Sequence, residues 1–233
     1  MEPVHPSHAI RYRFSQDHAK GKVVLDAGCA DGFGSTLLAE VALSVHAIDN
    51  DPALIAEAQK KHARANITFQ SGDVRSLPFP DNTFDCAVGF EIIEHFKDQG
   101  AFLRELRRVV KPGGVLIIST PDHVANMKIG VYQPRHEGHG HPGELTFLEF
   151  FYLMNHYFSA PRFYGQFFYR EPSIRDRLIN FAKRIDILGL RKLIPRRMRN
   201  AHNPSVQIYE QDAQIKVLDR PAVQILAVAT NKK

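Results

Sequence analysis

One stretch, residues 23–34, constrains the fold of this chain more than any other part of the sequence. It begins with the aliphatic run Val23-Val-Leu25, which is typical of a strand buried on both faces. Asp26 and a turn rich in glycine follow, and residues 35–41 then have the apolar spacing of an amphipathic helix. A strand, a glycine-rich turn and a helix in this order let a ligand approach the backbone at a helix N-terminus.

The spacing within the turn argues against two common nucleotide sites. Counted from Gly28, the second and third glycines of the dinucleotide fingerprint would fall on Ala30 and Phe33. No Lys-Ser or Lys-Thr pair follows the glycines, so the pattern does not fit a phosphate-binding P-loop either. A carboxylate at Asp26 would repel a pyrophosphate, but it suits a ligand that carries an ammonium group. The turn therefore predicts a nucleoside that bears an amino acid.

The chain then alternates predicted strands and helices. Further strands are expected over residues 45–49, 66–73, 84–90, 115–119 and 223–229. A strand followed by a helix, repeated five times, indicates a doubly wound α/β sheet. Asp49 ends the second strand, 21 residues after Gly28, where a carboxylate can accept hydrogen bonds from both ribose hydroxyls. Asp51, directly before Pro52, is instead expected to cap the next helix.

Six short motifs, in order, resemble those of the class I S-adenosylmethionine (SAM) dependent methyltransferases. They lie at residues 24–32, 47–49, 72–73, 77–85, 93–95 and 106–114, and the resemblance covers roughly residues 10 to 170. It implies a seven-stranded Rossmann-like sheet, mostly parallel, that ends in an antiparallel hairpin between residues 163–168 and the last strand. One departure is Ala30, where the family usually has glycine, and a methyl group there would crowd the cofactor.

The resemblance also implies a domain organisation and a cofactor. We expect a single domain over residues 1–233, with an N-terminal helical cap at 1–20 and a basic helical insertion at 170–220. Asp73 is expected to reach the adenine amine, and Val74 to offer its backbone amide. Tyr12 and Phe14 fit a helix that closes over the cofactor and a plain packing helix equally well. The residues expected to bind SAM are Tyr12, Asp26, Gly28, Ala30, Gly32, Asp49, Asn50, Asp73, Val74 and Phe90.

The acceptor atom is predicted to be oxygen. The signature of amino-methylating enzymes of nucleic acids is absent after the fourth strand, where Phe90-Glu-Ile-Ile93 stands, and no cysteine is placed as a nucleophile. Methylation of a hydroxyl needs a general base. Amine and carbon acceptors are the less favoured alternatives to oxygen. The candidates for the base are His141, His139, His95 and Glu144, with Glu91 also considered.

The loop that supplies most of these candidates carries a further resemblance. Residues 141–146, His-Pro-Gly-Glu-Leu-Thr, resemble an element in a branch of the family that is associated with surface-glycan and glycolipid assembly. A sugar, glycolipid or other small acceptor is therefore expected, although His141 fits a polar surface residue equally well. The histidines at 136–141 also suit a metal, but they lack a recognised metal-site spacing, so no metal is predicted.

Charge bears on the partners. The net charge is +5, yet residues 170–200 alone hold ten Lys or Arg against three acids. The favoured interpretation of this basic segment is a helix face exposed to solvent. The more specific alternative is peripheral membrane contact through residues 174–199. RNA-directed methylation by this segment and a degenerate SAM-binding domain without activity are the alternative functions. With no apolar run of about 20 residues and no signal-peptide pattern, a cytoplasmic protein is expected.

Overall fold

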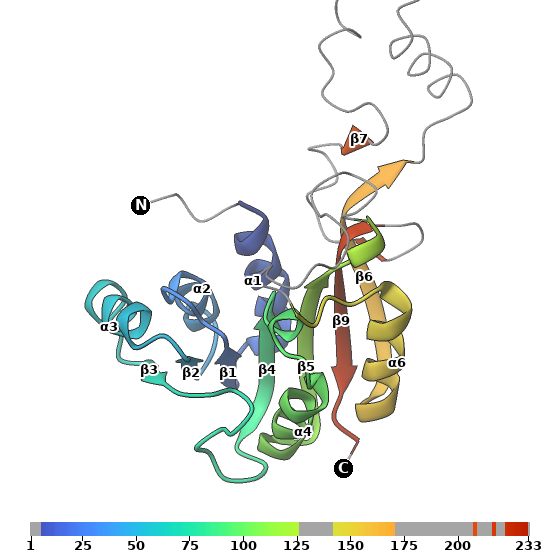
Figure 1. The fold of residues 1–233 in the computed structure, drawn as a ribbon. Coiled ribbons are helices and arrows are strands. Elements are labelled where there is room, and N and C mark those ends of the chain that lie inside the picture. Colours follow the sequence, from blue (N-terminus) through green and yellow to red (C-terminus); the bar gives the residue numbers. More distant parts are fainter. Residues whose placement is uncertain (1–5, 126–141, 171–206, 209–215, 218–221, 233) are drawn as a thin grey trace, which may run out of the picture.

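The computed structural model describes residues 6–125, 142–170, 207–208, 216–217 and 222–232. The described part is a central sheet with helices on both faces (Figure 1). Its helices are α1 (Pro6–Ala19), α2 (Phe33–Ala39), α3 (Pro52–Lys61), the short η1 (Ile93–His95), α4 (Gln99–Val109) and α6 (Phe147–Tyr157). Its main strands are β1 (Val23–Ala27), β2 (Ser44–Asp49), β3 (Ile67–Ser71), β4 (Phe84–Phe90), β5 (Val110–Pro121), β6 (Ser159–Arg170) and β9 (Ala222–Thr230).

The sheet has the predicted mixed topology. The main strands lie in the order β3-β2-β1-β4-β5-β9-β6. Neighbouring strands from β3 to β5 are parallel, and β9 is antiparallel to both β5 and β6. This confirms the seven-stranded Rossmann-like sheet with a final antiparallel hairpin. Two short strands of two residues each, β7 (Gln207–Ile208) and β8 (Lys216–Val217), also pair with β6.

Alternate residues of the strands point to opposite faces of the sheet and pack into two hydrophobic cores, as a doubly wound sheet requires. Leu25 of β1 and Ala87 of β4 pack with the apolar faces of α4 and α6. Val24 and Val88, their neighbours along the same strands, pack instead with α1 and α2 on the other face. Because both faces are covered, the carboxyl ends of β1, β2 and β4 are left as the place for a site.

The expected alternation of strand and helix fails once. Residues 72–83, between β3 and β4, contain no helix. Pro78 and Pro80 lie within this segment, and each removes a backbone donor and disfavours helical geometry at the residue before it. The parallel crossover from the edge strand β3 to β4 is therefore made by an extended loop.

Helix α6 begins with a capping box that the sequence Thr146-Phe-Leu-Glu149 supplies. The Thr146 hydroxyl accepts a hydrogen bond from the Glu149 backbone, and the Glu149 carboxylate accepts one from the Thr146 backbone at 2.8 Å. Phe150 and Met154 are buried beneath the helix, as the apolar spacing predicts, whereas Leu148 and Tyr152 are exposed. The cap thus fixes the start of the helix that closes the face carrying α4.

Replacing Thr146 by alanine should lower the free energy of unfolding by about 1 kcal/mol, because the first turn of α6 loses one partner for its free N–H groups. Denaturant unfolding followed by circular dichroism would measure the loss. Thr146→Ser keeps the capping oxygen and is expected to stay near the wild-type value. Equal destabilisation by both substitutions would show that the methyl group, and not the cap, is what matters.

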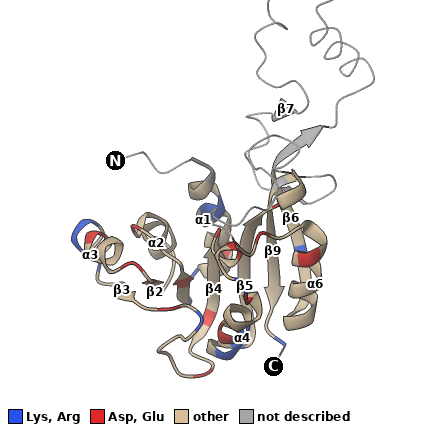
Figure 2. Cartoon of the chain, in the orientation of Figure 1, with Lys and Arg blue, Asp and Glu red and all other residues tan. Residues whose placement is uncertain are grey.

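Charges in the described part are largely balanced locally. Figure 2 shows Lys and Arg on α3 and α4 beside Asp and Glu, and the ion pairs Lys61–Glu57 and Arg108–Glu105 lie on these two helices. Most of the basic segment at 170–200 lies outside the described residues, as does most of the predicted insertion at 170–220. Among the described residues, no helix is long and apolar enough to cross a membrane.

Candidate cofactor site

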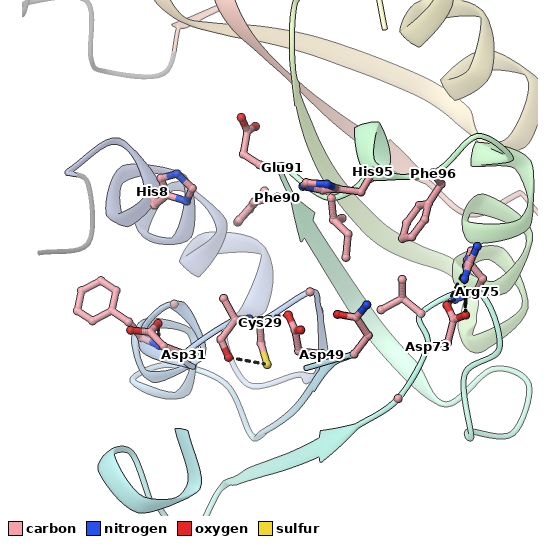
Figure 3. A pocket seen from close by; sticks show the side chains of 18 of the residues that line it. His8, Cys29, Asp31, Asp49, Asp73, Arg75, Phe90, Glu91, His95 and Phe96 are labelled. Carbon is pink, nitrogen blue, oxygen red and sulfur yellow. Dashed lines mark hydrogen bonds and ion pairs between the residues drawn. The ribbon is translucent and has the colours of Figure 1, made fainter. Parts of the chain in front are cut away.

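A cavity of about 460 Å³ opens at the carboxyl ends of β1, β2 and β4, where α1 leans over them (Figure 3). This volume lies within the range of small-molecule sites. Its walls come from five segments of the chain that are distant in sequence. They contribute His8, Tyr12, Gly28, Cys29, Ala30, Asp31, Phe33, Gly34, Asp49, Asn50, Gly72, Asp73, Val74, Arg75, Phe90, Glu91, Ile92, His95 and Phe96.

The turn after β1 holds Ala30 in a conformation that favours glycine. Ala30 has a φ of 47°, in the left-handed region where glycine is at ease and alanine is strained. Its backbone N–H donates to Oδ2 of Asp49 at 2.9 Å, so the turn keeps this geometry despite the side chain. Ala30 is exposed and lies in the cavity wall.

Asp49 lies at the end of β2 and anchors two backbone groups. Its second oxygen, Oδ1, accepts a hydrogen bond from the Asp51 N–H at 3.0 Å. Asp51 in turn caps α3 by accepting hydrogen bonds from Ala53 and Leu54, as predicted. Asp49 thus presents a fixed carboxylate to the cavity, and each of its oxygens retains capacity for another donor such as a ribose hydroxyl.

Asp26 lies beneath the cavity and is not part of its wall. It is fully buried, with Oδ1 accepting from the Tyr12 hydroxyl at 3.1 Å and Oδ2 from the Ser35 hydroxyl at 2.6 Å. Burial raises the pKa of Asp26 from 3.8 to about 6, although the bonds from Ser35 and Tyr12 oppose the rise. Its direct contact with an ammonium group stays a prediction, and the contact that the structure gives is with Tyr12.

Tyr12 joins α1 to the floor of the site. Its ring packs edge-on against Phe90 with centroids 4.9 Å apart. A Cβ atom at Gly34 would lie 2.0 Å from the same ring, so only glycine lets α2 approach Tyr12 this closely. Phe14, by contrast, packs against Tyr164 and is not in the cavity wall. The two interpretations of this helix therefore separate, with Tyr12 at the site and Phe14 in the packing.

The wall at the exit of β3 carries an ion pair that the sequence did not suggest. Asp73 accepts three hydrogen bonds from the Arg75 guanidinium, two from Nε and one from Nη2. The guanidinium also lies 5.1 Å from the centre of the Phe96 ring. These hydrogen bonds hold the pKa of Asp73 below its ordinary value. Val74 lies between the two and Asn50 beside Asp49, so both predicted residues line the cavity.

The remaining predicted residues fall in different places. Gly28 and Phe90 line the cavity, whereas Gly32 begins α2 behind the wall. His95, in η1, is exposed and lines the cavity. Glu144 pairs with Nδ1 of His123 and lines a separate hollow beside α6, so the structure does not bring it to this cavity. His139 and His141 lie outside the described residues.

Sequence reasoning missed several wall residues, among them His8, Asp31 and Arg75. Asp31 lies within the glycine-rich motif at residues 24–32, and its Oδ1 accepts a hydrogen bond from the Phe33 backbone N–H at the start of α2. Among the described residues, no group of three or more His, Cys, Asp or Glu side chains could hold a metal ion. The histidines at 136, 139 and 141 lie outside those residues.

Comparison with known proteins adds the family to this geometry. The family described as "Methyltransferase domain" matches residues 25–118, which run from β1 to β5. Residues 25–118 of this chain are thus similar to a methyltransferase domain, and the relatives that match the same part are named as SAM-dependent methyltransferases. The "Probable S-adenosylmethionine-dependent methyltransferase" of Mycolicibacterium smegmatis is 38% identical over 117 residues, which are 50% of this chain and 45% of that protein.

Other relatives agree on the domain and on its extent. The ubiquinone biosynthesis O-methyltransferase of Coxiella burnetii is 33% identical over 125 residues, 52% of this chain and 53% of its own. The matched part of this chain thus spans about half the length of these curated relatives. Among solved structures, the YcgJ protein of Bacillus subtilis has a TM-score of 0.59 at 18% identity, covering 99% of this chain and 100% of that one, which shows the shared fold.

Proposed function

We propose that this protein transfers a methyl group from SAM to an oxygen of a small acceptor, such as a sugar or glycolipid. The observation that carries the proposal is a fixed carboxylate, Asp49, beside the glycine-rich turn of a methyltransferase domain and facing a cavity of about 460 Å³. When bound, SAM supplies a methyl group on a positively charged sulfur. The residues present fit such a cation, because Asp31, Asp49 and Asp73 line the cavity.

Cofactor binding divides among three walls of the cavity. We assign the ribose to Asp49 and Asn50, the adenine to the segment of Asp73 and Val74, and the amino-acid end to the turn at Gly28 and the Tyr12 side. These assignments follow the family resemblance and are supported by the place of each residue in the cavity wall. Arg75 is occupied by Asp73, so the wall offers little free positive charge to a pyrophosphate.

Among the base candidates we favour His95. Of His141, His139, His95 and Glu144, it is the one that both lies in the described part and lines the cavity. Its imidazole stands near Glu91, across the cavity from Asp49 in Figure 3. An imidazole suits proton removal from a hydroxyl near neutral pH. The sugar or glycolipid acceptor rests on the resemblance of residues 141–146, most of which line the separate hollow beside α6.

The other functions raised by the sequence gain no support from the described residues. RNA-directed methylation would use residues 170–200, most of which lie outside them. A degenerate domain would require Ala30 to close the site, yet the turn keeps its bond to Asp49 and the cavity remains open beside it. The C. burnetii relative is named as an O-methyltransferase, which favours oxygen as the acceptor atom.

Calorimetric titration of the full chain with S-adenosylhomocysteine, the product form of the cofactor, is the direct test. We expect saturable binding, and none with NAD at the same concentration. Acceptor pools of simple glycosides and glycolipids would then be screened for release of S-adenosylhomocysteine, with His95→Ala expected to bind the product normally and to lose turnover. No binding by the wild-type protein would overturn the proposal.

A further inference from the structure

Glu91 has an unusual backbone for a side chain that faces a cavity. It directly follows β4 and has a φ of 53°, in the left-handed region that residues with a Cβ atom rarely adopt. Its N–H points to Ser119 of β5, with the carbonyl oxygen at 3.2 Å and the hydroxyl at 3.3 Å. Such conformations persist where the surroundings fix them, and they gather at functional sites.

The Glu91 carboxylate is fixed as firmly as its backbone. Oε1 accepts the Ser119 hydroxyl at 2.7 Å, and Oε2 accepts the Gln224 side-chain amide of β9 at 3.1 Å. The side chain is nevertheless 15% exposed and lies in the cavity wall. Each carboxylate oxygen has a second lone pair, so the group can still accept a hydrogen bond from a ligand.

Behind this carboxylate lies a buried cation. Arg11 of α1 is 1% exposed, and its Nη1 lies 3.8 Å from Oε1 of Glu91. Nη1 also donates to Gln166 at 3.0 Å and to Gln224, which joins α1 to β6 and β9. Within the described part of the chain, Glu91 is the acid that pairs with Arg11, and the Nε and Nη2 atoms of Arg11 have no hydrogen-bond partner there.

This arrangement gives the pair a direction. Arg11 is not in the cavity wall and Glu91 is, so the pair presents its negative end to the cavity. The next acid, Glu94, is 1% exposed; burial first, and Glu91 second, raise its pKa well above the ordinary value. Glu94 is buried and is not in the cavity wall, so Glu91 is the carboxylate that this end of the cavity presents.

We propose that Glu91, held in place by Ser119, Gln224 and the buried Arg11, is the acceptor-binding carboxylate of the cavity. It would select acceptors that donate hydrogen bonds and carry no negative charge near the reacting oxygen. The inference rests on the proposed methyl transfer and narrows its substrate class to neutral polyols and phenols. Arg11 is a positioning residue in this scheme, because it acts on the acceptor only through Glu91.

Matched pairs of acceptors that differ by one carboxylate test the charge rule. Suitable probes are methyl hexosides with the corresponding methyl uronosides, and catechol with 2,3-dihydroxybenzoate. The wild-type protein should prefer the neutral member by at least about tenfold in kcat/KM, because a second carboxylate beside Glu91 is a repulsive contact. Equal rates, a preference for the acidic member, or no turnover of any pair would overturn the inference.

Variants assign the effect to Glu91. Glu91→Gln should lower kcat/KM for the neutral member at least about tenfold and shrink the preference toward one, with S-adenosylhomocysteine affinity unchanged. Arg11→Lys should retain more of the preference than Arg11→Met, since only lysine keeps the cation behind the carboxylate. Glu57→Gln, the same charge change in an exposed pair on α3, is the control expected to match wild type.

The outcomes separate this inference from the function beneath it. If the wild-type protein does not bind S-adenosylhomocysteine, the proposed methyl transfer itself is overturned. Normal binding and turnover together with an unchanged preference in Glu91→Gln would leave methyl transfer standing and overturn only the role of Glu91. Circular dichroism of each variant confirms that the sheet is intact before its rates are compared.

Discussion

Replacing Asp49 by alanine should weaken binding of S-adenosylhomocysteine by at least about 100-fold, because a hydrogen bond to a charged group contributes roughly 1.5–3 kcal/mol and this carboxylate is assigned two ribose hydroxyls. The substitution also removes the acceptor for the Ala30 N–H. The glycine-rich turn then loses a hydrogen bond that holds Ala30 in its strained left-handed conformation. Both effects reduce affinity. Calorimetric titration of the variant beside the wild-type protein measures them together.

Asp51→Ala is the matched control, two residues away on the same loop. It removes the oxygen that caps α3 and should lower the free energy of unfolding by about 1 kcal/mol. Asp51 is not in the cavity wall, so its replacement should leave product affinity near the wild-type value. Wild-type affinity in Asp49→Ala, or an equal loss of binding in the two variants, would contradict the assignment of Asp49 to the ribose.

Much of the fold was predictable because it is written in local patterns. The aliphatic run before Asp26, the acid that ends the second strand and the proline after Asp51 each specify geometry within a few residues. The mixed sheet and its final hairpin followed from the family resemblance and are confirmed by the pairing of β9 with β5 and β6. Pro78 and Pro80 are a local signal against a helix before β4, and the expected alternation of strand and helix did not take them into account.

The acceptor end of the site could not be read in the same way. Arg11, Glu91, Gln166 and Gln224 come from α1, the end of β4, β6 and β9, and only the tertiary fold brings them together. An arginine in an N-terminal helix ordinarily indicates a solvated surface, and nothing near residue 11 in the sequence indicates its burial. Asp26 is easily recognised within its sequence motif, but its two hydroxyl partners, Tyr12 and Ser35, come from two different helices, α1 and α2.

The burial of Asp26 should make stability depend on pH in an identifiable direction. Its pKa is about 6 in the folded protein against 3.8 ordinarily, so the folded state holds a proton that the unfolded chain releases between these values. Its favourable contribution is complete below about pH 4 and is lost as the pH rises through 6. The change amounts to roughly 3 kcal/mol, because one unit of pKa corresponds to about 1.4 kcal/mol.

Asp26→Asn isolates this contribution, since the asparagine keeps a similar shape and cannot ionise. The free energy of unfolding of the variant minus that of the wild-type protein should rise by roughly 3 kcal/mol between pH 4 and pH 8, measured by urea unfolding. Taking the difference removes the opposing effect of Asp73 and Asp85, whose lowered pKa values favour the folded state at higher pH in both proteins.

The hydroxyl partners of Asp26 supply the second half of this experiment. The hydrogen bonds from Ser35 and Tyr12 both favour the ionised carboxylate, and the one from Ser35 lowers the pKa of Asp26 more. Ser35→Ala should therefore raise the pKa of Asp26 further and move the stability loss to higher pH, with Thr36→Ser, a neighbouring hydroxyl that does not contact Asp26, as control. A difference curve for Asp26→Asn that is flat with pH would show that Asp26 is ionised at ordinary cost, and that the floor of the site is wetter than the structure describes.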